Sequence, residues 1–147
     1  MFRHEFVVDC EVEKVWNFFT DPKHFEAISP VDLNERLVRA SNNTLVLGTD
    51  IWISTDLFFR RTWHARVVKL EEPYEYDDEV YDRLLKNWIH RHSFVKIGAK
   101  KKTSVIDEIT FKFGYGQFGR IVKRIVFTAL EPIFPHRASK TKEILQT

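Results

Sequence analysis

The 147-residue sequence contains a single cysteine, Cys10, and no long hydrophobic run. One cysteine excludes an intramolecular disulfide and any cysteine-rich metal site, and it favours a reducing compartment. No apolar run approaches the about 18 residues that a membrane-spanning helix needs, and the first residues do not have the pattern of a signal peptide. We therefore expect a cytoplasmic protein with no integral membrane segment.

A strong excess of charge is also lacking, because 23 basic residues face 21 acidic ones. A balanced chain does not favour a nucleic-acid partner. Basic side chains do gather at residues 100–102 and at Arg120, Lys123 and Arg124. No aromatic residues interleave with them as they do in single-strand binding sites, so we expect solvated surfaces there.

Short motifs for nucleotide binding and nucleophilic catalysis are missing. The chain has no Gly-x-Ser-x-Gly elbow, and Gly114, Gly116 and Gly119 do not follow a phosphate-loop or dinucleotide pattern. Cys10 has no activating neighbour in the sequence. The sequence therefore predicts no cofactor and disfavours nucleophilic catalysis.

Aromatic residues, by contrast, are abundant: 13 Phe and 4 Trp within a chain that is 44% apolar. A chain of this length buries about 68–70% of the surface exposed when unfolded. No linker, internal repeat or low-complexity segment divides it, so we expect one domain over residues 1–147. The aromatic volume is available either to fill its core or to line a cavity.

The hydrophobic spacing changes along the chain. Residues 2–10 alternate as in a strand, residues 11–20 have apolar positions three and four apart as in a helix, and residues 23–28 fit a second short helix. Short strands separated by turn residues follow. They are expected at residues 34–40, 44–53, 61–71 and 74–82.

A hairpin is predicted next. A two-residue loop at Ala99 and Lys100 would place His92 opposite Asp107. The same register opposes Arg91 to Glu108, a charge pair suited to solvent, so the histidine face should be interior. The residues expected on that face are Trp88, His90, His92, Phe94, Val105, Asp107, Ile109 and Phe111.

The last third of the chain should provide a helix that covers the sheet. Its apolar stripe comprises Phe118, Ile121, Val122, Ile125, Val126, Ala129 and Leu130. Pro132 and Pro135 should kink or split the helix, with a second piece over about residues 136–145. The predicted class is layered α+β: an antiparallel curved sheet of six or seven strands around a long C-terminal helix, with two short helices after the first strand.

The order and spacing of several segments make the chain resemble the START-like, or SRPBCC, superfamily of helix-grip proteins. Within that superfamily it resembles the ligand-binding and polyketide cyclase/dehydrase-like members. The segments are Val15, Trp16, Phe18 and Phe19 before Asp21 and Pro22; Ile28, Ser29 and Pro30; Gly48 and Ile51; Trp63; the hairpin positions above; and Phe134 with Arg137. The resemblance implies a cavity between sheet and helix. Residues 82–87 depart from the glycine-containing turn of similar small bacterial proteins, which bears on the cavity mouth.

His90, His92 and Asp107 form the principal candidate site. A carboxylate that accepts a hydrogen bond from an imidazole fixes its tautomer and raises its basicity, which suits ligand orientation or acid-base catalysis on a carbonyl compound. The alternative is a hydrogen-bonded pair that only braces two strands. His-x-His could also hold a metal, with a nearby aspartate to complete the site and His64 as a conceivable third ligand, but no convincing fourth ligand is readable, so no metal is predicted.

The predicted function is binding of a small hydrophobic ligand, such as a lipid, a quinone or a polyketide-like molecule. The expected ligand-binding residues are Trp63, Trp88, His90, His92, Phe94, Asp107, Ile109, Phe111 and Ile125, with Phe58 and Phe59 near an entrance. One alternative is a polyketide cyclase or dehydratase that uses His90, His92 and Asp107 as acid and base. Another is a domain that binds a protein partner through exposed aromatic residues.

Overall fold

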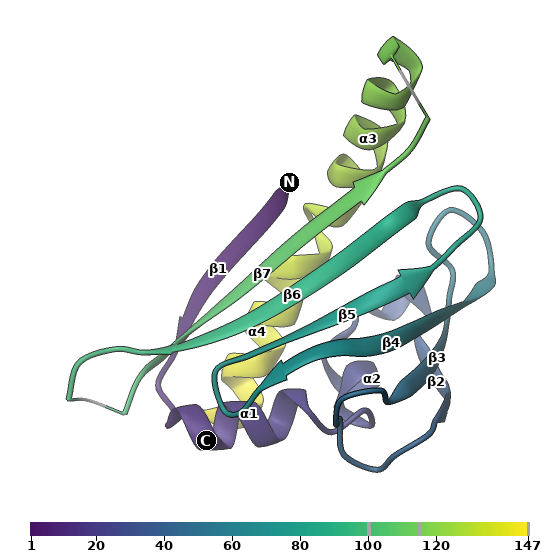
Figure 1. Ribbon diagram of the computed structural model, residues 1–147. Coiled ribbons are helices and arrows are strands. Elements are labelled where there is room, and N and C mark those ends of the chain that lie inside the picture. The colour runs from purple at the N-terminus through teal and green to yellow at the C-terminus, as the bar shows by residue number, and fades with distance from the viewer. Residues whose placement is uncertain (100, 115, 147) are drawn as a thin grey trace.

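The computed structural model describes residues 1–99, 101–114 and 116–146, and the predicted α+β class is confirmed (Figure 1). Within these residues the strands are β1 (Phe2–Val8), β2 (Arg36–Ala40), β3 (Asp50–Thr55), β4 (Arg61–Glu71), β5 (Glu75–Tyr81), β6 (Lys86–Lys96) and β7 (Thr103–Lys112). The helices are α1 (Val12–Phe19), α2 (His24–Ile28), a 3-10 turn (Val31–Leu33), α3 (Gly116–Leu130) and α4 (Ile133–Leu145).

The strands form one antiparallel seven-stranded sheet in the order β1-β7-β6-β5-β4-β3-β2. The first strand thus pairs with the last, and the end of α4 lies near the residue that follows β1, where Gln146 Oε1 accepts from the backbone N–H of Asp9. Figure 1 shows α4 crossing one face of the sheet, with α1 near its end. That covered face is where the inward-pointing side chains of the central strands must lie.

The hairpin register predicted from the alternation is confirmed. His92 pairs with Asp107, Phe94 with Val105, and Arg91 with Glu108. Lys100, which the predicted loop contains, lies outside the described residues. Inward side chains of β6 and β7 therefore include both histidines and the aspartate.

Apolar side chains form two clusters on this face. In the first, the ring of Trp16 on α1 meets Tyr76 and Phe94 edge-on, with centroids 6.0 and 5.9 Å apart. In the second, Trp88 stacks on Phe111 at 5.1 Å beneath α3 and α4. Burying each such aromatic side chain contributes about 1.5–3 kcal/mol, so these clusters hold the helices to the sheet.

Pro132 divides the C-terminal helical region into α3 and α4, as expected from its missing amide donor. The second helix nevertheless begins at Ile133, before the predicted residue 136. Pro135 lies within the first turn of α4, where no amide donor is needed, so the kink predicted there is wrong. No helix among the described residues is long and apolar enough to cross a membrane.

The predicted apolar stripe covers the sheet only in part. Val126 and Leu130 are buried, but Phe118, Ile121 and Ile125 are 66%, 57% and 53% exposed. The reason is that α3 runs out past the end of the sheet, so that α4 provides most of the cover (Figure 1). The strand expected from residue 44 also begins later, at Asp50, because Gly48 adopts a positive φ of 86° in a turn.

Gly119 allows the start of α3 to approach the end of β7. A Cβ atom at this position would lie well inside 3.0 Å of the backbone carbonyl oxygen of Phe113. A backbone atom cannot rotate away as a flexible side chain can, so the helix itself would have to shift.

Gly119→Ala should therefore lower the free energy of unfolding by about 1–3 kcal/mol, although alanine is the better helix former. Urea unfolding followed by circular dichroism measures this, with Thr128→Ala on the exposed side of the same helix as control. An unchanged or higher stability in Gly119→Ala would contradict the close approach.

Candidate functional site

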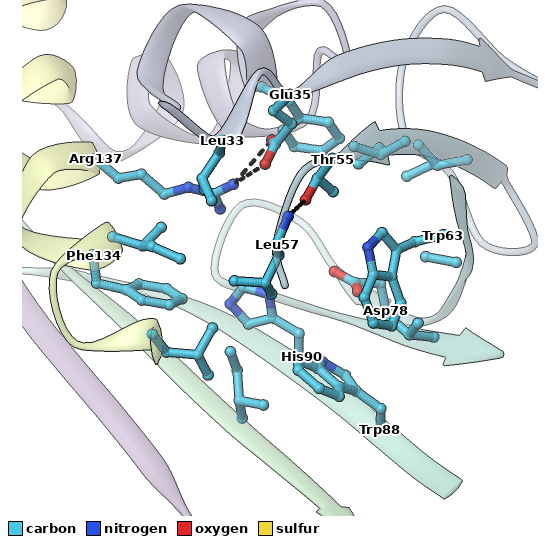
Figure 2. Close-up of a pocket in the computed structure, with 18 of the residues that line it drawn as sticks. Leu33, Glu35, Thr55, Leu57, Trp63, Asp78, Trp88, His90, Phe134 and Arg137 are labelled. Carbon is cyan, nitrogen blue, oxygen red and sulfur yellow. Dashed lines mark hydrogen bonds and ion pairs between the residues drawn. The ribbon is translucent and has the colours of Figure 1, made fainter. Parts of the chain in front are cut away.

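A cavity of about 170 Å³ lies between the inner face of the sheet and the junction of α3 with α4 (Figure 2). Its wall is mainly apolar. The apolar lining residues are Phe25, Leu33, Ile51, Ile53, Leu57, Trp63, Ala65, Val80, Trp88, Ile109, Leu130, Ile133 and Phe134. Such a wall with few polar groups is typical of a small-molecule site.

Two groups of polar side chains interrupt this wall. His90 and His92 on β6 and Asp78 on β5 belong to the sheet, whereas Glu35 and Arg137 belong to the opposite side (Figure 2). Alternation explains the first group, because His90 pairs directly with Asp78 across the two strands. The cavity therefore has a polar floor on the sheet and a charged pair facing it.

Asp107 on β7 contacts both histidines but does not line the cavity. Its Oδ1 atom lies 3.0 Å from Nε2 of His90, and Nε2 of His92 lies 3.0 Å from Oδ2 of Asp78. Nδ1 of His92 is also 3.0 Å from Oδ1 of Asp107, but at an angle too poor for a hydrogen bond. The two imidazole rings are only 3.7 Å apart between centroids, so the four residues form one compact cluster.

The cluster separates the pKa values of the two imidazoles. Burial lowers the pKa of His92, but interaction with the carboxylates of Asp107 and Asp78 outweighs it and raises the value to about 9. Burial and the neighbouring charge of His92 lower the pKa of His90. Burial raises the pKa of Asp107, yet its two imidazole partners hold it well below its ordinary value.

Tyr76 on β5 is paired with His92 on β6 and packs against the cluster. Its ring stacks on His92 with centroids 4.3 Å apart, and its hydroxyl donates to the carbonyl oxygen of Phe19 at 3.3 Å. Burial is the main cause that raises the pKa of the Tyr76 phenol, so it stays neutral. A fully buried ring with a fixed hydroxyl holds the His92 imidazole in one plane.

The opposite charged pair joins α4 to the segment before β2. Nη2 of Arg137 donates to both carboxylate oxygens of Glu35 at 3.0 Å (Figure 2). Glu35 is buried, and the guanidinium Nε atom of Arg137 is buried without a hydrogen-bond partner among the described residues. This pair closes one side of the cavity and leaves one donor free near it.

The structure brings five of the predicted ligand-binding residues to the cavity wall: Trp63, Trp88, His90, His92 and Ile109. Asp107 lies behind the histidines, against a separate hollow of about 20 Å³.

Three other predicted residues do not line this cavity, which corrects their expected position. Phe94 packs against α1, and Phe111 lies under the ring of Trp88. Ile125 is largely exposed, because α3 runs past the sheet. Phe58 and Phe59 are also exposed, in the loop that follows Leu57 of the cavity wall.

Sequence reasoning did not identify Asp78 as a site residue. β5 is in fact a central strand, and its inward residues are Tyr76, Asp78 and Val80. Their common parity was a readable signal. Glu35 was missed as well, since nothing near it in sequence marks its contact with Arg137, 102 residues away.

The raised pKa of His92 makes stability depend on pH. The unfolded pKa is 6.5, so the contribution is fully present below pH 6.5 and is lost as pH rises through about 9. In protein freed of metal ions by a chelator, the free energy of unfolding should fall by up to roughly 3 kcal/mol as the pH rises from 6.5 through about 9. Urea unfolding at several pH values measures this. His92→Gln should flatten the dependence, and an equally steep loss in that variant would contradict the assignment.

Comparisons with known proteins find similarity in structure only. No protein-family model matches the sequence, and no curated protein matches it. A nucleoside-diphosphate sugar epimerase from Corynebacterium glutamicum is 17% identical with a TM-score of 0.71, over 99% of this chain and 29% of that one. The chain thus spans under a third of that protein.

Two further solved structures match over most of both chains. A protein from Arthrobacter aurescens is 14% identical, with a TM-score of 0.72 over 98% of this chain and 84% of the other. A START superfamily protein from Mycobacterium smegmatis is 14% identical, with a TM-score of 0.67 over 98% and 95%. With its seven-stranded antiparallel sheet and C-terminal helices, this chain has a helix-grip fold similar to that of this START superfamily protein.

Proposed function

We propose that this protein is a single START-like domain that binds a small hydrophobic ligand in the cavity between the sheet and α4. The observation that carries the proposal is the cavity itself, an apolar wall interrupted by two facing polar groups. One of these polar groups also has an unused donor: the buried Nε–H of Arg137 has no partner among the described residues, and a buried donor without a partner is costly unless a ligand binds it.

The size of the cavity limits the ligand. A cavity of about 150 Å³ is known to accept a benzene molecule, and this one measures about 170 Å³. The enclosed part of the ligand is therefore about one ring or a short branched chain. A longer lipid, quinone tail or polyketide chain would have to extend beyond the enclosed volume.

The polar groups suggest where oxygen atoms of the ligand would lie. The Nε–H of Arg137 can donate to a carbonyl or hydroxyl oxygen, the carboxylate of Asp78 can accept from a hydroxyl group, and the ring of His90 can donate or accept according to its tautomer. A ring that carries oxygen substituents, as a quinone does, fits this arrangement better than a plain hydrocarbon.

Native mass spectrometry of the purified protein, followed by organic extraction, tests the proposal. A bound apolar molecule at one equivalent would support it and reveal its chemical class. An empty protein whose tryptophan fluorescence also ignores quinones, fatty acids and aromatic polyketides would contradict it, and would favour binding to a protein partner.

Ala65→Phe should block the cavity, because Ala65 on β4 lines it and a phenyl ring would occupy much of its volume. We expect affinity for a single-ring quinone to fall at least about tenfold, or about 1.4 kcal/mol. Val68→Phe, on the exposed side of the same strand, is the matched control and should bind normally. Equal binding by both variants would place the ligand elsewhere.

A second function, acid-base catalysis, is favoured by the divergence of the two histidine pKa values. His92 is held protonated while His90 is held neutral, and both line the cavity. Neighbouring groups whose pKa values are pushed apart can act as acid and base. A polyketide-like substrate could then lose water or cyclise.

Mass spectrometry of polyketide-like hydroxy-ketones incubated with the protein would detect loss of one water molecule. If the protein is such an enzyme, His92→Gln should reduce turnover by at least about 100-fold while binding is retained. Absence of any product in the wild-type protein across the panel would leave the binding function alone supported.

A further inference from the structure

Three potential metal ligands meet on the floor of the cavity. One donor atom from each of Asp78, His90 and His92 lies within 4.8 Å of the other two. They come from two adjacent strands, so their backbone positions are fixed by the sheet rather than by a loop. The sequence predicts no metal because no convincing fourth ligand is readable beside the two histidines and a nearby aspartate, and it does not single out Asp78.

We propose that Asp78, His90 and His92 bind one divalent transition-metal ion. Two imidazoles and one carboxylate are a donor set used by zinc and by non-haem iron, in sites that keep further coordination positions open. Nε2 of His92 and Oδ2 of Asp78 already lie 3.0 Å apart, close to the spacing of two ligands on one ion. Only small side-chain rotations are needed to bring the third donor in.

Charge balance supports the ion. The side chains of Asp78 and Asp107 are only 15% and 8% exposed, and they place two negative charges around the two imidazoles. One imidazolium compensates half of this charge, whereas a divalent cation with two neutral imidazoles compensates all of it. Buried charges are costly unless they are balanced or coordinate a metal.

The surroundings also match those of metal sites. A ligating histidine commonly donates its other ring N–H to a carboxylate, which fixes its orientation. Asp107 stands in that position for both rings, 3.0 Å from Nε2 of His90 and from Nδ1 of His92. Nδ1 of His92 is buried and lacks a well-formed hydrogen bond, and a slight rotation of the ring onto an ion would complete it.

The site opens onto the cavity, because all three proposed ligands line it. Oxygen atoms of a bound molecule could fill the remaining coordination positions. The proposal goes beyond the binding function and does not depend on it, since an apolar molecule can occupy the cavity without the ion. It does compete with acid catalysis by His92, because a metal-bound imidazole carries no extra proton.

Another His–Asp pair serves as an internal comparison. The ring of His64 donates to Asp50 at 2.8 Å and stacks on Trp52, but the pair is partly exposed, on the other side of the sheet. It does not belong to a three-donor group among the described residues. His64→Ala is therefore a matched control for loss of one histidine.

The test is titration of the chelator-treated protein with Co²⁺ and Zn²⁺ at fixed pH, with binding measured by calorimetry and, for Co²⁺, by visible absorption. We expect one equivalent to bind. Asp78→Asn and His90→Ala should each weaken binding by at least about tenfold, and Asp107→Asn by about 10- to 100-fold. His64→Ala should bind like the wild type.

Two results would overturn the proposal: no stoichiometric binding by the wild type, or equal affinity in wild type and Asp78→Asn. The wild-type titration decides even where a variant fails to fold, as judged by circular dichroism. Quinone binding is measured separately with and without chelator, so loss of the metal site and loss of the ligand cavity give different results.

Discussion

Period-two alternation in three adjacent strands places four titratable side chains on the buried face of the sheet, and the rest of the site depends on it. The group is Asp78, His90, His92 and Asp107, and a slip of β5, β6 or β7 by one residue would turn the members of the group on that strand towards solvent. The outer face helps fix the register: Arg91 binds both carboxylate oxygens of Asp77, at 3.0 and 2.9 Å. Because Asp77 and Arg91 are paired residues of β5 and β6, this ion pair and the inner cluster require the same alignment.

The helices that cover the sheet, α3 and α4, leave open space above this cluster. Pro132 ends α3 and starts α4, and residues on both sides of the break, Leu130, Ile133 and Phe134, line the cavity. A single straight helix would present a continuous ridge to the sheet. The break instead turns the chain at the place where the cavity forms, and Arg137 one turn later ties α4 to Glu35.

A buried group of two carboxylates and two imidazoles contributes less to stability than an apolar core of equal volume would. Each member here has at least one partner, and Tyr76 holds His92 by stacking, so the arrangement is rigid. Rigid, desolvated polar groups beside a cavity are suited to orienting a ligand, moving a proton or binding an ion. All three uses draw on the same four side chains.

The sequence by itself determined the α+β class, the first helix, the β6–β7 register and the inward face that carries His90 and His92, because each depends on local periodicity. It also predicted a break in the C-terminal helix at Pro132 or Pro135, which the structure has at Pro132. The tertiary structure alone decided that β5 is central, which turned Asp78 inward, and that α3 runs past the sheet, which left Ile125 exposed. It also decided the pairing of Glu35 with Arg137. These features depend on which strands and helices become neighbours, and contacts between residues far apart in the chain leave no periodic signal in the sequence.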